Sequence, residues 1–167
     1  MQRMINIRPF EERHWDATWQ IIAPVFRAGE TYAFSPDITE EQAHKAWVEI
    51  PLATFVAVDK SNDVFGTYYI KPNQPALGAH VCNCGYIVSE HARCRGIASE
   101  MCAHSQGEAV SRGFRAMQYN LVVSTNEGAV RLWRRHGFEV IGTLPKAFRH
   151  SQLGFVDAFV MYKQLET

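Results

Sequence analysis

Apolar residues in the first part of the chain switch between strand-like and helical spacing. Residues 4–8 fit a short strand, and large apolar side chains recur at helical intervals over residues 11–26. Pro24 is expected to kink or end that helix, because its ring removes a backbone donor and clashes with the preceding turn. Thr39 is a suitable N-cap for a second helix, which Pro51 closes.

The rest of the chain alternates strands with helices. Residues 54–58 and 64–70 fit a hairpin with a polar turn, and a loop containing three Pro or Gly residues follows. Beyond it we expect strands at 80–88, 116–123, 138–142 and 155–162, with helices from Ile97 to near Gly113 and over 127–135. This order of seven strands and four helices predicts an α/β fold, with flanking helices around a mixed central sheet.

Size and charge narrow the class of protein. The chain has 167 residues, of which 47% are hydrophobic, so residues 1–167 are expected to form a single domain with one core. Lys plus Arg and Asp plus Glu both number 17. Since nucleic-acid binding needs a basic surface, no nucleic-acid partner is expected.

The sequence has neither a targeting pattern nor a metal-binding pattern. Residues 1–15 lack the apolar run of a secretory signal, and no later stretch approaches the ~20 apolar residues of a membrane span. We therefore expect a cytoplasmic protein with no membrane partner. All four cysteines fall between Cys82 and Cys102 and complete no zinc pattern with histidine, so reduced thiols packed in the core, and no metal, are expected.

The most informative segment joins a predicted strand to a predicted helix at residues 88–98, Val-Ser-Glu-His-Ala-Arg-Cys-Arg-Gly-Ile-Ala. Backbone N–H groups at a helix N-terminus have no intrahelical acceptor and can hold a phosphate. The small residues Gly96 and Ala98 would let an anion approach these groups, and Arg93 and Arg95 add positive charge. A glycine at a helix start also serves backbone geometry alone, so this turn needs the support of a second motif.

That second motif lies at residues 126–138, Asn-Glu-Gly-Ala-Val-Arg-Leu-Trp-Arg-Arg-His-Gly-Phe. The segment Arg93-x-x-Gly96-x-Ala98 resembles the R/Q-x-x-G-x-G/A acetyl-CoA motif of the GNAT superfamily of N-acetyltransferases. Asn126-x-x-Ala129, followed by Gly137-Phe138, resembles the N-x-x-A…G-F block of the same superfamily. The resemblance is close over residues 80–145 and implies the single-domain GNAT fold.

This resemblance implies that the cosubstrate acetyl-CoA lies between two splayed central strands. Its pantetheine would pair with the strand near Ile87 and Val88, the Val88 N–H would polarise the thioester carbonyl, and Asn126 would bind the cofactor from the other side. The implied cofactor-binding residues are Ile87, Val88, Arg93, Cys94, Arg95, Gly96, Ile97, Ala98, Ser99, Asn126 and Trp133.

Trp133 departs from the common pattern of the superfamily. Many members carry at this position a tyrosine that protonates the departing CoA thiolate. Because an indole N–H is no acid near neutral pH, the proton would here come through water, or a hydrogen bond from Asn126 would suffice. Trp133 fits an ordinary core residue equally well.

Four further stretches resemble fungal N-acetyltransferases that detoxify azetidine-2-carboxylate, a proline analogue: Tyr69 to Asn73, His80 to Gly85, Tyr119 to Asn126 and Gly142-x-x-Pro145-Lys146. These relatives also carry Trp at the position of Trp133. The resemblance implies that Asn83 binds the acceptor, and that Asn120 and Asn126 are catalytic together with Val88. Asn120 and Asn126 stand six residues apart, so on one strand their side chains would share a face. The alternative is structural, with Asn83 in a strand bulge and Asn120 bonded to neighbouring backbone.

The expected function is direct transfer of acetyl from acetyl-CoA to a small-molecule amine, for instance an amino or imino acid, in a ternary complex. Protein or peptide N-acetylation and a non-catalytic acyl-CoA sensor stay open as alternatives. A covalent acetyl-cysteine has little support, since no Cys–His pair stands at a readable spacing. The general-base candidates, none of which is assigned, are His80, Glu90, His91 and Asp157. The sequence also leaves a homodimer open.

Overall fold

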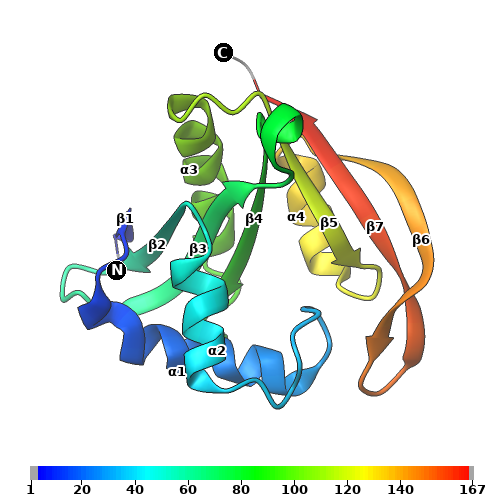
Figure 1. Cartoon of the computed structure of the whole chain (residues 1–167). Coiled ribbons are helices and arrows are strands. Elements are labelled where there is room, and N and C mark those ends of the chain that lie inside the picture. Colours follow the sequence, from blue (N-terminus) through cyan, green and yellow to red (C-terminus); the bar gives the residue numbers. More distant parts are fainter. Residues whose placement is uncertain (1–3, 166–167) are drawn as a thin grey trace.

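A seven-stranded sheet with helices on both faces forms the protein, whose computed structural model describes residues 4–165 (Figure 1). Its strands are β1 (Asn6–Pro9), β2 (Ala53–Val58), β3 (Val64–Pro72), β4 (Val81–Val88), β5 (Ala116–Val123), β6 (Glu139–His150) and β7 (Gly154–Gln164). They lie in the order β1-β2-β3-β4-β5-β7-β6, and all neighbours are antiparallel except the parallel pair β4 and β5. The predicted α/β fold with a mixed seven-stranded sheet is confirmed.

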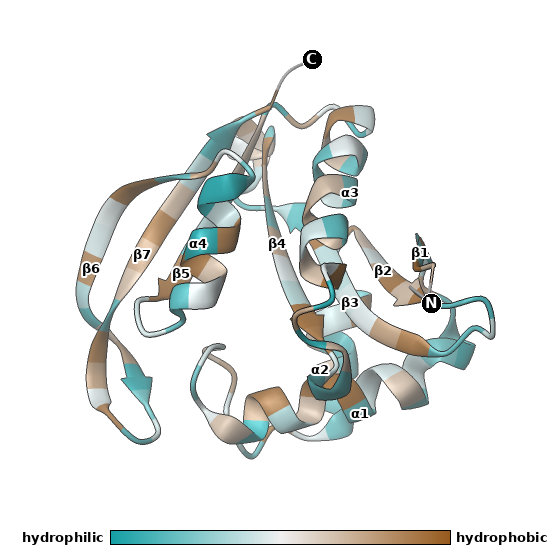
Figure 2. Cartoon of the chain, turned by 180° about the vertical axis from the view of Figure 1, so that it is seen from behind, coloured by the Kyte–Doolittle hydropathy of each residue, from teal (hydrophilic) through white to brown (hydrophobic). Residues whose placement is uncertain are grey.

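The helices are α1 (Trp15–Ala28), α2 (Glu40–His44), α3 (Ile97–Ser111) and α4 (Glu127–Arg135). Shorter turns are η1 (Glu12–His14), η3 (Ala76–Gly78) and η4 (Glu90–Ala92), and a π-helical turn η2 (Lys45–Glu49) continues α2. Figure 1 shows α2 in front of the sheet, and the opposite view in Figure 2 shows α3 and α4 in front of it. Two buried clusters accordingly fill the two sides, one under α3 and α4 and the other under α1 and α2.

Two elements extend beyond their predicted ends. Pro24, which was expected to kink or end the first helix, does not end it: α1 continues to Ala28, and Gly29 caps it in the left-handed conformation, with φ of 64°. Burial of Ile22 and Phe26 on both sides of the proline holds this helix together across the lost hydrogen bond. Strand β6 was expected over residues 138–142 and extends to His150, because pairing with β7 sustains it past two register shifts where its own pattern is weak.

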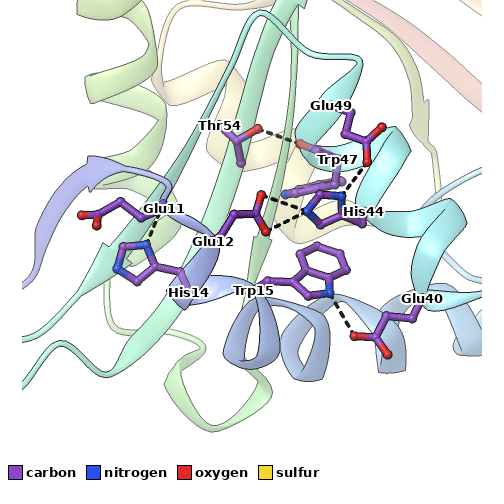
Figure 3. Close-up of polar contacts among 9 residues, drawn as sticks. All are labelled: Glu11, Glu12, His14, Trp15, Glu40, His44, Trp47, Glu49 and Thr54. Carbon is purple, nitrogen blue, oxygen red and sulfur yellow. Dashed lines mark hydrogen bonds and ion pairs between the residues drawn. The ribbon is translucent and has the colours of Figure 1, made fainter.

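Polar contacts fix the first helices to each other (Figure 3). Trp15 Nε1 donates to Glu40 Oε1 across 2.9 Å and so joins α1 to α2. The ring of His44 packs edge-on against Trp15, with centroids 4.6 Å apart, and its two nitrogens lie 3.2 Å from Glu12 Oε2 and 2.9 Å from Glu49 Oε1. The cluster of these five side chains links η1, α1, α2 and η2.

The second helix is also anchored to the sheet. Thr39 caps it as predicted, since Thr39 Oγ1 accepts from the Gln42 N–H at 3.2 Å and Gln42 Oε1 accepts from the Thr39 N–H at 3.0 Å. The fully buried Trp47 donates its indole N–H to Thr67 Oγ1 on β3 across 3.0 Å. The Trp47 bond thus fixes η2, and with it the capped helix α2, to β3.

Candidate active site

The two central parallel strands separate after two paired positions. β4 and β5 pair at Val81↔Ala116 and Cys82↔Met117 only. One position further, Asn83 Nδ2 donates to the carbonyl oxygen of Gln118 across 2.9 Å, so a side chain replaces the next rung of the ladder. Beyond it the strands diverge (Figure 1), and a cleft of about 1280 Å³ opens between them. The predicted splay of the central strands is confirmed.

Most residues that the sequence indicated line this cleft. They are Asn83, Ile87, Val88, Arg93, Cys94, Gly96, Ile97, Ala98, Ser99, Asn120, Asn126 and Trp133. Arg95 is exposed and is not among the described residues that line it. The cleft thus reaches from β3 and the loop after α1, across β4 and β5, to the start of α3 and to α4.

The backbone of β4 presents every second residue to the cleft. The Val81 carbonyl and the Ser89 N–H make hydrogen bonds of 2.8 Å on the β3 side of the strand. Since successive strand residues direct their N–H and C=O groups to opposite sides, Tyr86 and Val88 direct theirs toward β5. The Val88 N–H therefore faces the cleft, whereas the backbone of Ile87 faces β3 and only its side chain lines the cleft.

Tyr32, in the loop after α1, holds the cleft-facing backbone groups of Tyr86. Its hydroxyl accepts from the Tyr86 N–H at 2.7 Å and donates to the Tyr86 carbonyl at 2.8 Å. The ring packs between Phe26 and Trp47, with centroids 6.0 and 5.9 Å away. Burial raises the pKa of Tyr32, so the phenol stays neutral. Sequence reasoning missed this residue, because a single aromatic in a loop belongs to no motif.

The turn before α3 is open toward the cleft. Gly96 is the N-cap, with φ of 81°, and no side chain caps the helix. A Cβ added at Gly96 would have no atom within 4 Å, so the space beside this end of the helix is open. Cys94 also has a positive φ, of 60°, which helps to curl the turn. The free N–H groups and the Arg93 side chain fit a pyrophosphate.

Asn126 lies outside β5, which ends at Val123. It is the N-cap of α4, and its Oδ1 accepts from the Ala129 N–H at 3.4 Å. The prediction that Asn120 and Asn126 share a face through strand alternation was therefore wrong. Both side chains line the cleft for another reason: the end of β5 and the start of α4 border the same gap.

Amide side chains are hydrogen-bonded to one another at the end of the cleft away from α3. Asn120 Nδ2 donates to Asn73 Oδ1 across 2.7 Å, and Gln118 Nε2 donates to Asn120 Oδ1 across 2.9 Å. Asn83 is not in a bulge, because the β3–β4 register is regular through Lys71↔Asn83. Asn120 bonds to side chains rather than to backbone, and β5 is irregular on its other side, between Tyr119 and Val122. Bulges of this kind are common beside active sites.

Trp133 covers two buried phenols. Its ring lies 4.9 Å from Tyr86 and 5.1 Å from Tyr119. Tyr119 donates to the Tyr86 hydroxyl across 2.9 Å, and the Tyr86 hydroxyl lies 2.6 Å from Ser105 Oγ, which in turn donates to the Cys102 carbonyl. Burial raises the pKa of both phenols well above the ordinary value. This chain of hydrogen bonds runs to the backbone of α3 and offers no proton to the cleft.

The four cysteines differ in burial. Cys82, Cys84 and Cys102 are buried as predicted, while Cys94 is exposed, because it stands in the open turn. Cys84 lines the cleft, but burial raises the pKa of its thiol, which disfavours the thiolate that an acetyl-cysteine route needs.

Of the four general-base candidates, Glu90 and His91 line the cleft, whereas His80 and Asp157 lie outside it.

Across residues 4–165, no group of three or more His, Cys, Asp or Glu side chains is placed to hold a metal ion. No helix in the same range has the length and apolar character to span a membrane.

Comparison with known proteins gives one family. The model of the acetyltransferase (GNAT) family matches residues 15–138. The N-acetyltransferase aca1 of Schizosaccharomyces pombe is 36% identical over 110 residues, which are 65% of this chain and 52% of that protein. The chain thus spans about half the length of this curated relative.

Solved structures of N-acetyltransferases agree with the match to the acetyltransferase (GNAT) family. A GCN5-related N-acetyltransferase from Kribbella flavida is 41% identical and superposes with a TM-score of 0.92, over 96% of this chain and 98% of that one. A phosphinothricin acetyltransferase from Sinorhizobium meliloti, solved in complex with AcCoA, has a TM-score of 0.85 over 99% of this chain and 89% of its own. At 18% identity the latter shows the shared fold alone.

Proposed function

The chain belongs to the acetyltransferase (GNAT) family of enzymes, and we propose that it transfers acetyl from acetyl-CoA to the amine of a small amino or imino acid. One observation carries the proposal: a single cleft joins the open N-terminus of α3 to the amides Asn83 and Asn120. Anion-binding N–H groups at one end suit the cofactor. Amides, which donate and accept together, suit a small acceptor with both an amine and a polar group.

Acetyl-CoA would supply an activated thioester to this cleft. The N–H groups of Ile97 to Ser99, with Arg93, would hold the pyrophosphate, and the cleft-facing edge of β4 would pair with the pantetheine. The Val88 N–H faces the same gap and would polarise the thioester carbonyl, a role for which one prepositioned donor is worth roughly 3 kcal/mol. The Sinorhizobium meliloti enzyme, which shares the fold, was solved in complex with AcCoA, and this supports acetyl-CoA as the cosubstrate.

The reaction needs no nucleophilic side chain. The neutral acceptor amine would attack the thioester carbonyl, the C–S bond would break, and the acetyl group would pass to nitrogen while the amine proton leaves to water. Trp133 has no acidic proton, and Tyr86 and Tyr119 are tied into the chain of hydrogen bonds toward α3. The CoA thiolate would thus take its proton from water, and the side chain of Asn126 would donate a hydrogen bond to the thiolate.

Asn83 and Asn120 would hold the acceptor. Asn83 is almost buried, at 8% exposure, and uses one of its two N–H groups on Gln118, which leaves the other for a ligand. Replacing it by alanine should impair use of the acceptor by about 1–3 kcal/mol while acetyl-CoA binding stays close to normal. The resemblance to azetidine-2-carboxylate acetyltransferases favours an imino acid as that acceptor.

The test is thiol release from acetyl-CoA with a panel of acceptors: azetidine-2-carboxylate, cis-4-hydroxyproline, a polyamine, an aminoglycoside and an N-terminal peptide. Calorimetry with acetyl-CoA is run beside it. We expect cofactor binding, and turnover with the imino acids. Turnover of the peptide alone would point to protein acetylation, and tight cofactor binding without turnover of any amine would point to a sensor; both results contradict the proposal.

A further inference from the structure

Lys71 is a cation in the cleft that has no acidic partner among the residues that the structure describes. It lies on β3, is half-buried, and pairs in register with Asn83 on β4. Its Nζ stands 5.2 Å from the centre of the Tyr69 ring, and Tyr69 in turn donates to Asn83 Oδ1 across 3.4 Å. Among residues 4–165, no carboxylate lies within ion-pair distance of this ammonium group.

The cofactor phosphates do not explain this charge. Asn83, the register partner of Lys71, precedes Val88 by five residues, which is about 17 Å along a strand. The phosphate-binding N–H groups begin beyond Val88, at the start of α3. Lys71 therefore stands at the end of the cleft opposite the pyrophosphate, where the acceptor would lie.

The surroundings of Lys71 are rich in donors and poor in acids. Alternation along β3 and β4 puts Tyr69, Lys71 and Asn83 on the same face of the sheet, the face that α1 and α2 cover. Within residues 4–165, the acidic residues that line the cleft are Glu30, in the loop after α1, and Glu90, beyond Val88. Neither forms an ion pair with Lys71.

A cation beside amide N–H groups recognises a carboxylate, since charge-assisted hydrogen bonds to carboxylate oxygens are the strong ones. The face of Tyr69 restricts where the ammonium group can lie, and so it reduces the entropy lost when a ligand binds. We propose that Lys71 binds the carboxylate of the acceptor and makes this enzyme selective for amines that also carry an acid group. The inference rests on the proposed function and assigns it a specificity residue.

The experiment compares two matched acceptors, azetidine-2-carboxylate and azetidine-2-carboxamide, which differ by one charge. Steady-state KM and kcat are measured by thiol release at saturating acetyl-CoA for the unmodified enzyme, Lys71→Met and Lys71→Arg. Lys60→Met, in the exposed turn between β2 and β3, is the control. Ratios of variant to unmodified enzyme are compared within each acceptor, which cancels the difference in amine basicity.

We expect Lys71→Met to raise KM for the carboxylate by about tenfold or more, and to leave KM for the carboxamide and for acetyl-CoA unchanged. Lys71→Arg should keep most of the preference, and Lys60→Met all of it. An equal loss with both acceptors, or an unchanged KM for the carboxylate, overturns the role of Lys71 and leaves amine acetylation intact. If the unmodified enzyme acetylates neither azetidine but does acetylate the peptide, the proposed function and this inference fail together.

Discussion

The hydroxyl of Tyr32 satisfies both main-chain polar groups of Tyr86, at 2.7 Å from the nitrogen and 2.8 Å from the oxygen. At this residue β4 has already parted from β5, so a side chain from 54 positions earlier occupies the place of a neighbouring strand. The same backbone edge is the one along which we propose the pantetheine to lie. Tyr32 thus connects the loop after α1 to the edge that receives the cofactor.

Replacing Tyr32 by phenylalanine keeps the ring and removes this bridge. Two buried backbone groups then lose their partner, which should lower the free energy of unfolding by about 1–3 kcal/mol in urea titrations. If the cofactor takes over the freed groups, saturating acetyl-CoA should reduce this loss beyond what it does for other destabilised variants. An equal loss with and without acetyl-CoA would mean that the cofactor does not reach Tyr86.

The open turn at Gly96 predicts a sharp effect of a carboxylate. Gly96→Glu should reduce acetyl-CoA affinity by at least about 100-fold, because the new charge faces the N–H groups that would bind the pyrophosphate. Gly113→Glu is the matched control: its φ is 85°, it also has nothing within 4 Å of a Cβ, and it follows the other end of α3. Calorimetry that finds normal affinity in a folded Gly96→Glu protein would refute the cofactor assignment.

Asn126 combines a helix cap with the proposed contact to the thioester, and two substitutions separate them. Asn126→Ala should lose about 1 kcal/mol of stability with the cap, together with most of the turnover. Asn126→Ser retains a capping oxygen, so stability should return while kcat stays low. If Asn126→Ser recovered both stability and kcat, the role of Asn126 would be structural only.

Trp133 should be dispensable for the chemistry. Trp133→Phe keeps an aromatic ring against Tyr86 and Tyr119 but leaves a smaller volume, so a loss of about 1–3 kcal/mol in stability is expected with a measurable rate retained. Thermal unfolding measures the change in stability, and thiol release on the same sample measures the rate that remains. A folded variant that binds CoA normally and has no turnover would give the indole a catalytic role.

His44 should make stability depend on pH. Partial burial lowers its pKa, but the hydrogen bonds to Glu49 and Glu12 outweigh burial and leave the pKa above the ordinary 6.5. The folded state then holds the proton more tightly, so this stabilisation is complete below the unfolded pKa and is lost as pH rises through the folded one.

The variant that tests this is His44→Gln, with His80→Gln at an exposed site as control. Because both glutamates are mostly exposed, the effect should be on the order of 0.5 kcal/mol at about pH 5.5 and should fade toward about pH 8.5. Melting curves across this range would contradict the assignment if the gap to the unmodified protein stayed constant.

Much of the fold followed from local sequence pattern. β5 and α4 have the predicted bounds, because their periodicity and caps act within a few residues. The extent of β6 and the continuation of α1 past Pro24 depend on partners distant in the chain, which local pattern does not contain. Tyr32 and Lys71 were missed for the same reason: each acquires its role only from strands that folding brings beside it.

Because β4 and β5 pair at only two positions, the rest of each strand has an unpaired edge, and this affects the tendency to aggregate. An unpaired strand edge invites strands from other molecules and promotes aggregation. Here the free edges lie inside the sheet, with Asn83 closing one end and Tyr32 blocking the middle of β4. The tip of the β6–β7 hairpin contributes His150 and Leu153 to the cleft and contacts the end of α1, where the Ser151 N–H donates to the Gly29 carbonyl at 3.0 Å. The side chains that prepare the cleft for a ligand therefore also keep the empty protein from recruiting a foreign strand.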